Sequence, residues 1–330
     1  MELRQFKYFV AIVDSGSLSR AAQTLYIAQS ALSKQIADLE GELGTQLLDR
    51  TRNGVRVTET GQIFYEYSQA ILKQVEDVKA AVKSTASHIV GQVAVAIPQS
   101  VSNALALPLN IAARQKLPGI TLNLNEELTG NLIDQLQQGR VDFILFTDNI
   151  SPNSFKVRPI VQEELFLISA THNPPLPEGS PLTLANTVEL PLLLSSKEHD
   201  HCLRALVDIQ AANQGIAIKN VVAEINSVHI LKSAVLAGLG HTIFPKAPVQ
   251  VEINQGLLKA TRIGSEGVFR NLVICTSKSI PMTTPKRAVL GLILEVIYGL
   301  CESGAWPGAT ALFDHDLKAS LLTEGAGFFG

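Results

Sequence analysis

The chain has 330 residues, 46% hydrophobic and 17% charged, which is enough apolar material for a buried core and argues against disorder throughout. At roughly 100–200 residues per domain, this length predicts two domains. The formal net charge of −3 excludes a protein that binds nucleic acid or membranes through bulk positive charge, but it allows one whose basic groups lie along one edge.

The first residues predict three short helices. Apolar residues at spacings of three and four indicate a helix over residues 3–14. Ser17 can N-cap a second helix that runs to Tyr26. A third helix is expected over residues 28–43, and Gly44 would end it. The inward-facing residues of this third helix would be Ala31, Leu32, Ile36 and Leu39.

Two short strands are expected after the third helix. They cover residues 46–48 and 55–58, on either side of Arg52-Asn53-Gly54, and an Asn-Gly pair is a strong signal for a hairpin turn. Helices joined by a tight turn and followed by a hairpin are typical of a winged helix-turn-helix. Residues 1–58 are therefore predicted to form a DNA-binding domain of this kind.

Residues 59–89 predict one long helix with Thr58 as its N-cap. Its apolar residues follow a spacing close to a heptad repeat: Phe64, Tyr67, Ile71, Val75, Val78 and Val82. Such a stripe either packs on the chain's own globule or pairs with a second copy, and the heptad spacing favours a dimer.

Strands and helices alternate over residues 90–302, which predicts an α/β domain with a parallel sheet and helices on both faces. Strands are expected at 93–97, 120–124, 141–146, 164–170, 192–194, 221–224, 241–244 and 272–275, and helices at 100–116, 131–138, 202–212, 227–237 and 285–301. Crossovers near residues 162 and 270 would give two lobes. One lobe would hold residues 90–161 and 270–302, and the other residues 162–269.

The tail, residues 303–330, is Gly-rich and weakly patterned, and we expect disorder or loose packing there. The three cysteines, Cys202, Cys275 and Cys301, show no C-x-x-C spacing, and their odd number fits thiols in a reducing compartment. No secretion signal follows Met1, and no apolar run reaches the ~20 residues of a spanning helix. We therefore expect a cytoplasmic protein without a membrane partner.

The sharpest motif runs through the predicted helix-turn-helix. It reads Gly16-Ser17-Leu18-Ser19-Arg20-Ala21-Ala22, Leu25, Ala28-Gln29-Ser30-Ala31-Leu32-Ser33-Lys34-Gln35-Ile36, Leu47-Leu48-Asp49-Arg50, Gly54 and Thr58-Glu59-Thr60-Gly61. This pattern resembles the LysR-type bacterial transcriptional regulators, and the resemblance covers residues 1 to about 300. Segments such as Tyr8-Phe9-Val10 and Glu163-Glu164-Leu165-Phe166-Leu167 look most like a nitrogen-control subgroup, which implies a role in nitrogen or amino-acid metabolism.

The start of the third helix is the predicted base-reading end, because a recognition helix meets base edges with its N-terminal residues. Glutamine can bond adenine, while serine and lysine reach bases or phosphates. Arg50, Arg52 and Arg56 lie in the predicted hairpin, or wing, and suit contacts to the phosphate backbone of DNA. The DNA-binding residues expected are Ser17, Gln29, Ser30, Ser33, Lys34, Arg50, Arg52, Arg56 and Thr58. Residues 1–84 hold ten basic and ten acidic residues, so the joint pattern, and not net charge, carries this prediction.

The resemblance also implies a two-lobed effector domain with a cleft, similar to periplasmic binding proteins. In α/β folds, ligands lie where strands end and helices begin, since free N–H groups there attract anions. The effector-binding residues expected are Ser100, Val101, Ser102, Thr147, Ser196, Ser227 and Phe244. Alternatively, each serine only N-caps a helix. Asp148 would disfavour an acidic ligand close to Thr147.

Catalytic and metal sites find little support in the sequence. His199-Asp200-His201-Cys202 offers two histidines at i and i+2, which do not share a helix face, and no fourth ligand is evident. No G-x-S-x-G, phosphate loop or G-x-G-x-x-G is present, so neither an enzyme nor a cofactor is expected.

The prediction is thus a LysR-type regulator that forms a dimer or tetramer and binds a dyad-symmetric operator in double-stranded DNA. A small effector of unknown identity would change the contact with RNA polymerase. The alternative is a solute-binding module whose N-terminal helices only mediate assembly.

Overall fold

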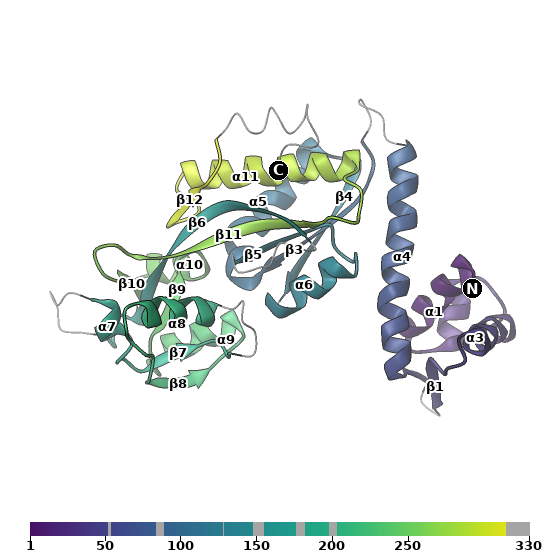
Figure 1. The fold of residues 1–330 in the computed structure, drawn as a ribbon, viewed down its shortest axis with the longest axis horizontal. Coiled ribbons are helices and arrows are strands. Elements are labelled where there is room, and N and C mark those ends of the chain that lie inside the picture. The colour runs from purple at the N-terminus through teal and green to yellow at the C-terminus, as the bar shows by residue number, and fades with distance from the viewer. Residues whose placement is uncertain are drawn as a thin grey trace. The chain divides into compact units, whose positions relative to one another are not determined.

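The computed structural model describes residues 1–51, 54–83, 89–127, 129–147, 155–175, 182–197 and 203–314. It divides into two compact units, each described here by itself (Figure 1). The first contains residues 1–83 with 137–140, and the second contains residues 84–136 with 141–330. No helix in the described ranges has both the length and the apolar character needed to cross a membrane.

The first unit is a winged helix-turn-helix followed by a long helix. Its elements are α1 (Leu3–Ser15), α2 (Leu18–Thr24), α3 (Gln29–Leu43), the antiparallel hairpin of β1 (Leu48–Thr51) and β2 (Gly54–Val57), and α4 (Glu59–Lys83). The Ser17 side chain accepts a hydrogen bond from the Arg20 amide, which confirms it as the N-cap of α2. Helix α2 ends two residues before Tyr26, whose positive φ of 55° is incompatible with a continuing helix.

The core of this unit lies between the three short helices. Leu32, Ile36 and Leu39 of α3 are buried there as predicted, together with Phe9 and Ile12 of α1. Ala31 is exposed, so its predicted inward orientation is wrong. One helical position separates Ala31 from Leu32, which turns its side chain about 100° away from the buried face.

The start of α4 packs tightly against the hairpin. The Thr58 hydroxyl accepts a hydrogen bond from the Gly61 amide at 3.0 Å, so Thr58 is the N-cap, and it donates to the Gln46 carbonyl at 2.8 Å. Gly61 is buried, and a Cβ atom at this position would lie 2.0 Å from the Leu47 carbonyl oxygen. Only glycine allows this approach of helix and strand.

We expect Gly61→Ala to lower the free energy of unfolding of the first unit by about 1–3 kcal/mol, as overpacking typically does. Gly41→Ala in α3 is the matched control, because nothing lies within 4 Å of a Cβ there. This control should be neutral or stabilising by up to ~1 kcal/mol, since alanine favours helix over glycine. Urea unfolding followed by circular dichroism measures both variants, and equal stability would contradict the expectation.

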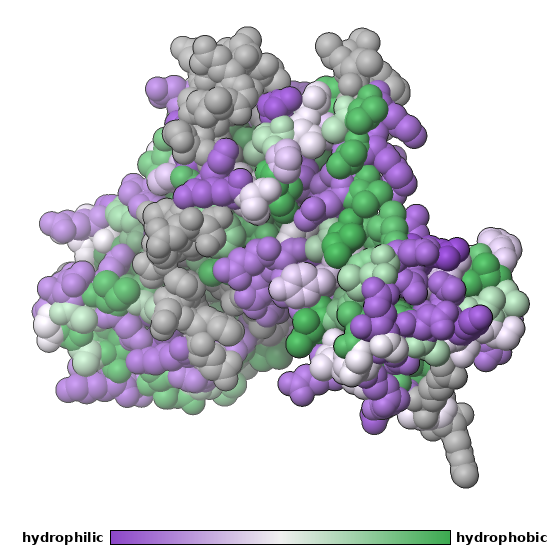
Figure 2. Space-filling view, turned by 45° about the vertical axis from the view of Figure 1, so that its right-hand side comes forward, coloured by the Kyte–Doolittle hydropathy of each residue, from purple (hydrophilic) through white to green (hydrophobic). Residues whose placement is uncertain are grey.

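The apolar stripe of α4 divides between the core and the surface. Phe64 stacks on Phe6 with ring centroids 5.3 Å apart and meets Phe9 edge-on at 5.1 Å. Further along α4, apolar side chains remain exposed and form a hydrophobic run along the helix (Figure 2). The exposed members of the predicted stripe are Tyr67, Ile71, Val78 and Val82, at 60%, 37%, 63% and 81%.

The second unit is an α/β domain. Its helices are α5 (Gln99–Lys116), α6 (Thr129–Gln137), α7 (Leu184–Thr187), α8 (Leu203–Asn213), α9 (Val228–Leu236), η1 (Ala247–Val249), α10 (Gln250–Asn254) and α11 (Thr284–Glu302). Its strands are β3 (Gly91–Pro98), β4 (Ile120–Glu127), β5 (Phe143–Thr147), β6 (Phe155–Ala170), β7 (Leu192–Leu194), β8 (Val221–Glu224), β9 (Thr242–Pro245), β10 (Leu258–Arg262), β11 (Val268–Ser277) and β12 (Ala309–Ala311).

The main sheet is mixed, which corrects the predicted parallel sheet. In the described residues its order is β10-β6-β11-β5-β3-β4, with β9 and β12 also paired to β6. Strand β3 is parallel to β4 and β5, as predicted. Strand β11 is antiparallel to both β5 and β6. Strands β6 and β11 each run through one of the predicted crossover points, near residues 162 and 270. A separate small sheet pairs β7 with β8 in parallel.

Helices cover both faces of the sheet, as expected. Helices α5 and α11 pack on one face of β3 and β5, while α6 packs on the other. Beyond residue 164, α7 and α8 lie on one face of β6, and α9 lies on the opposite face (Figure 1). The numerical lobe boundaries stay a prediction, because β6 contributes to the sheet along its whole length.

The expectation of a loose tail is wrong for residues 303–314. Trp306 is only 1% exposed and belongs to the core beside α5 and α11. Strand β12 then pairs antiparallel with β6. A large aromatic side chain with a buried partner for its N–H outweighs the local glycine content. Residues 315–330 lie outside the described part.

Candidate nucleic-acid interface and ligand pocket

The start of α3 presents a polar face to solvent. Gln29, Ser30 and Lys34 are exposed and Ser33 is half-buried. Their spacings of one, three and four residues place these side chains on one side of the helix, and Leu32 packs on the other. The N-cap, Ala28, makes no side-chain hydrogen bond, so α3 begins with free backbone N–H groups that suit a phosphate.

Tyr26 lies at the turn between α2 and α3 and is a feature that sequence reasoning missed. It is 94% exposed and is the one non-glycine residue with a positive φ in the described residues. Its exposed side chain lies shortly before α3 and adds a ring and a hydroxyl to the surface next to the polar face of that helix. The tyrosine side chain gave no warning of this backbone conformation, because a positive φ is uncommon for residues other than glycine.

The remaining predicted DNA-binding residues differ in their surroundings. Arg56 of β2 is exposed and lies opposite Asp49 in the hairpin register. Ser17 and Thr58 act as N-caps, and their role at a DNA surface stays a prediction. Arg52 and the side chain of Arg50 lie outside the described residues.

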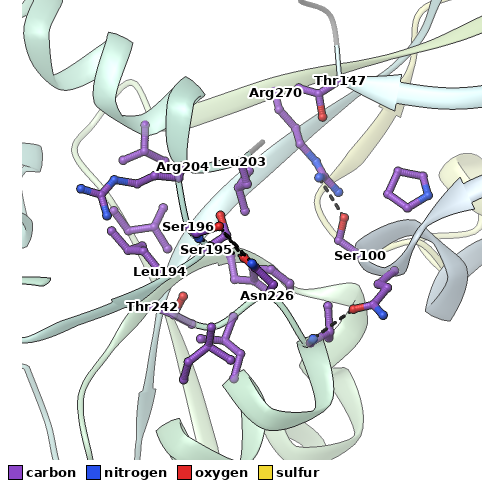
Figure 3. A pocket seen from close by; sticks show the side chains of 18 of the residues that line it. Ser100, Thr147, Leu194, Ser195, Ser196, Leu203, Arg204, Asn226, Thr242 and Arg270 are labelled. Carbon is purple, nitrogen blue, oxygen red and sulfur yellow. Dashed lines mark hydrogen bonds between the residues drawn. The ribbon is translucent and has the colours of Figure 1, made fainter. Parts of the chain in front are cut away.

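A pocket of about 140 Å³ opens in the second unit where several strands end and helices begin. The start of α5, which follows β3 directly, supplies Gln99 and Ser100, and β5 ends there with Thr147. From the other side come Ser196, after β7, and Phe244 of β9. Figure 3 shows that these groups come from distant parts of the chain and surround one space.

Four predicted effector-binding residues line this pocket: Ser100, Thr147, Ser196 and Phe244. Three others do not. Val101 is fully buried in the core beneath α5. The Ser102 hydroxyl donates to the Gln99 carbonyl and to Glu126. Ser227 accepts a hydrogen bond from the Ile230 amide as the N-cap of α9, which was the alternative considered for these serines.

Two buried arginines line the pocket and were missed from the sequence. Arg270 of β11 and Arg204 of α8 are each 3% exposed. Arg204 Nε donates to both oxygens of Asp208 at 3.0 Å. Arg270 forms an ion pair with Glu163 at 2.6 Å. The available signal was a lone cation within the apolar run of β11, where a buried charge needs a partner.

Polar side chains support the pocket wall. Asn226 and Ser196 bond each other: Asn226 Oδ1 accepts from the Ser196 amide at 2.9 Å, and Asn226 Nδ2 donates to Ser196 Oγ at 2.9 Å. His241, next to lining residue Thr242, has Nδ1 2.9 Å from Ser169 Oγ. Burial lowers the pKa of His241 below its usual value, because desolvation disfavours the charged ring.

Several predictions about reactive groups fall on residues that are not described. Asp148 and the run His199-Asp200-His201-Cys202 lie outside the described residues. Within the described ranges, no group of three His, Cys, Asp or Glu side chains could hold a metal ion. Cys275 is buried, and burial raises the pKa of the half-buried Cys301 thiol to about 11. A thiol with this pKa is a poor nucleophile at neutral pH.

Comparison with known proteins explains this combination of units. Residues 3–62 match the bacterial regulatory helix-turn-helix protein family of the lysR type, and residues 86–297 match the LysR substrate binding domain. The chain belongs to the LysR family of transcriptional regulators. It is therefore a DNA-binding regulator with an effector-binding domain, as the motif around α3 implied.

Family members with nitrogen-related names are among the similar proteins. The chain is 34% identical to the nitrogen assimilation regulatory protein of Escherichia coli (strain K12) over 298 residues, which is 90% of this chain and 95% of that protein. The corresponding Klebsiella aerogenes protein is 31% identical over the same lengths. The resemblance to a nitrogen-control subgroup is confirmed.

Solved structures of the LysR family share the fold. A full-length point variant of OxyR from Pseudomonas aeruginosa covers 94% of this chain, and this chain covers 98% of OxyR, with a TM-score of 0.68 at 20% identity. The structure of full-length CbnR in complex with its target DNA covers 90% of this chain, and this chain covers 98% of CbnR. The TM-score is 0.66 at 22% identity.

Proposed function

We propose that this chain binds a dyad-symmetric operator as a dimer or tetramer and regulates genes of nitrogen or amino-acid metabolism. The nitrogen assimilation regulators support the metabolic assignment. The regulator acts in the cytoplasm and has no catalytic activity. Its effector binds in the pocket lined by Ser100, Thr147, Ser196 and Phe244, and binding changes the contact with RNA polymerase.

The exposed polar face of α3 is the observation that carries the DNA-binding part of the proposal. Gln29, Ser30, Ser33 and Lys34 supply hydrogen-bonding groups of the kinds that distinguish base pairs in the major groove. The domain is close to electrically neutral, so bulk charge gives it little non-specific affinity. Sequence preference must come from this face, supported by phosphate contacts from the free N–H groups of α3 and from Arg56.

The experiment that tests this proposal is selection of binding sites from genomic DNA. Purified full-length protein is mixed with sheared DNA from its source at a fixed salt concentration, and the retained fragments are sequenced. Enrichment of dyad-symmetric sites next to nitrogen or amino-acid genes is the expected result. Retention of fragments without a common sequence would overturn sequence-specific regulation and favour the solute-binding module.

The exposed stripe of α4 predicts how two copies associate. We expect the double variant Val78→Glu/Val82→Glu to be monomeric in sedimentation at concentrations where the unaltered chain is a dimer, because four carboxylates would meet at the seam. Lys83→Glu changes the charge by the same amount on a different side of α4 and should leave the dimer intact. A dimeric double variant would exclude this stripe as the seam.

A further inference from the structure

The segment that follows α11 contributes a buried side chain behind the pocket. Trp306 Nε1 donates a hydrogen bond to Glu163 Oε1 at 2.8 Å. Strand β12 continues this packing, with Ala309 directly opposite Glu163 in the register with β6. Both lie beyond residue 297, where the match to the LysR substrate binding domain ends. This part of the chain is thus an addition to the matched domain that reaches its interior.

Glu163 connects Trp306 with Arg270. The Glu163 side chain has no exposed surface, and its Oε2 accepts a hydrogen bond from Arg270 Nε at 2.7 Å. The register of β6 with β11 places Arg270 directly opposite Glu163. Each carboxylate oxygen therefore has its own partner. Because buried carboxylates require such partners, removal of the indole N–H would leave Oε1 unsatisfied and release the orientation of the carboxylate.

Arg270 extends this arrangement into the pocket. Its Nη1 donates to Ser100 Oγ at 3.0 Å, and Figure 3 shows the guanidinium directed toward Ser100 at the pocket wall. Its Nη2 lies 2.6 Å from Glu163 Oε2, so the same carboxylate oxygen contacts both Nε and Nη2 of Arg270. Arg270 is among the residues that line the pocket, so its guanidinium places a positive charge at this wall.

Other groups around the pocket favour a negatively charged partner. Helices α5 and α8 begin at its wall, and the partial positive charge of helix N-termini attracts anions. The hydroxyls of Ser195 and Thr242 are further donors. Glu127 is the acidic residue among those that line the pocket. The rest of the lining is largely apolar: Leu194, Leu203, Val207, Ile225, Leu231 and Phe244.

We propose that Trp306 is a positioning residue of the pocket: through Glu163 it holds Arg270 in place to bind the carboxylate of a small organic acid with a short apolar body. The proposal rests on the proposed function in taking this pocket as the effector site. A cavity of about 140 Å³ restricts the ligand to a small molecule. The ion pair of Arg270 and Glu163 has no net charge, so binding of the ligand carboxylate also depends on the partial positive charge of the N-termini of α5 and α8.

Titration calorimetry with butyrate, hexanoate and their amides on the full-length protein tests the ligand class. The acids and amides share their shape and differ in charge, so we expect saturable binding of an acid at least tenfold tighter than that of its amide. The chain has a single tryptophan, and the fluorescence of Trp306 should respond to the same titration. Failure of both acids to bind, or equal binding of acid and amide, would overturn the assignment.

Trp306→Phe tests the positioning role, because it keeps an aromatic ring in the core while removing the N–H together with part of the volume of the indole. We expect it to weaken binding of the acid at least fivefold and to leave any amide binding unchanged. Glu163→Gln/Arg270→Gln keeps an acceptor for Trp306 without burying a lone charge, and it should remove the preference for the acid. Glu164→Gln/Arg262→Gln, a neighbouring and more exposed ion pair, is the matched control and should bind as the unaltered chain does.

Unchanged acid binding by Trp306→Phe would overturn the positioning role. If circular dichroism showed that Trp306→Phe is unfolded, the binding of acid and amide by Glu163→Gln/Arg270→Gln would decide whether Arg270 binds the carboxylate. A retained preference for the acid in that double variant would exclude Arg270 as the carboxylate site. These measurements contain no DNA. A failure of the site selection described above would therefore disprove the proposed regulation without affecting the outcome here.

Discussion

Replacing Ser33 and Lys34 together with alanine should abolish selection of operator sites while leaving the chain folded. Both residues lie on the solvent side of α3, so the core of Leu32, Ile36 and Leu39 is untouched. Base contacts are each worth about 1–3 kcal/mol of discrimination, so the double variant should lose affinity for a selected site on the order of 30-fold or more. Fluorescence anisotropy with a selected fragment, at one salt concentration, measures this loss.

Lys79→Ala is the matched control for the loss of one positive charge. Lys79 lies on α4 and pairs with Glu76 at 2.8 Å, outside the recognition helix. The Lys79→Ala variant should bind selected and unrelated fragments with nearly the affinity of the unaltered chain, and any small loss should be equal for both. If the double variant and this control retained the same selected sites with the same salt dependence, α3 would not read the sequence, and the binding would be phosphate attraction alone.

Asp142→Ala should lower the free energy of unfolding of the second unit by about 3–5 kcal/mol, because it removes one partner of a buried ion pair. Asp142 Oδ1 lies 2.9 Å from Lys286 Nζ of α11, and Oδ2 accepts a hydrogen bond from the Ala94 amide at 2.9 Å. The two side chains are 0% and 4% exposed. Urea unfolding followed by the fluorescence of Trp306 reports on this unit.

An exposed ion pair to the same helix provides the comparison. Lys116 pairs with Glu295 of α11, and its side chain is 52% exposed. Lys116→Ala should cost less than about 1 kcal/mol, as exposed ion pairs generally contribute little. The double variant Asp142→Leu/Lys286→Met should recover much of the stability lost in Asp142→Ala. Equal losses for Asp142→Ala and Lys116→Ala would show that burial does not raise the cost of breaking the pair.

Local signals in the sequence were sufficient for much of the first unit, although the first strand lies at Leu48–Thr51 and not at residues 46–48. Helix α3 and the N-caps Ser17 and Thr58 depend on neighbouring residues, and those patterns are visible without tertiary information. The backbone of Tyr26 was not visible in this way. Its positive φ belongs to the end of α2, where the Ile27 amide donates to the Ala22 carbonyl at 3.0 Å, and nothing in its own side chain favours it.

The second unit was harder to predict because its strands pair over long distances. Residues 155–163 of β6 contain Lys156, Arg158 and Pro159, which hide the strand pattern. The partner that makes the strand stable, β11, begins more than one hundred residues later. The pocket residue Arg270 escaped prediction for the same reason, since only the fold brings Glu163 to it. The sequence also did not show that the hydroxyls of Ser102 and Ser227 have partners outside the pocket lining, in Glu126 and in the N-cap of α9.

The placement of β11 between β5 and β6 has a consequence for the synthesis of this protein. Strand β5 ends at Thr147, and β11, its neighbour on one side, starts at Val268. At about 5–20 residues per second, the ribosome needs roughly 6–24 seconds to add the residues between them. During that time the nascent chain carries β5 with one backbone edge unpaired, and an open strand edge invites pairing with another chain. Chaperone demand should therefore be greatest in this interval, before translation reaches the strand that closes the sheet.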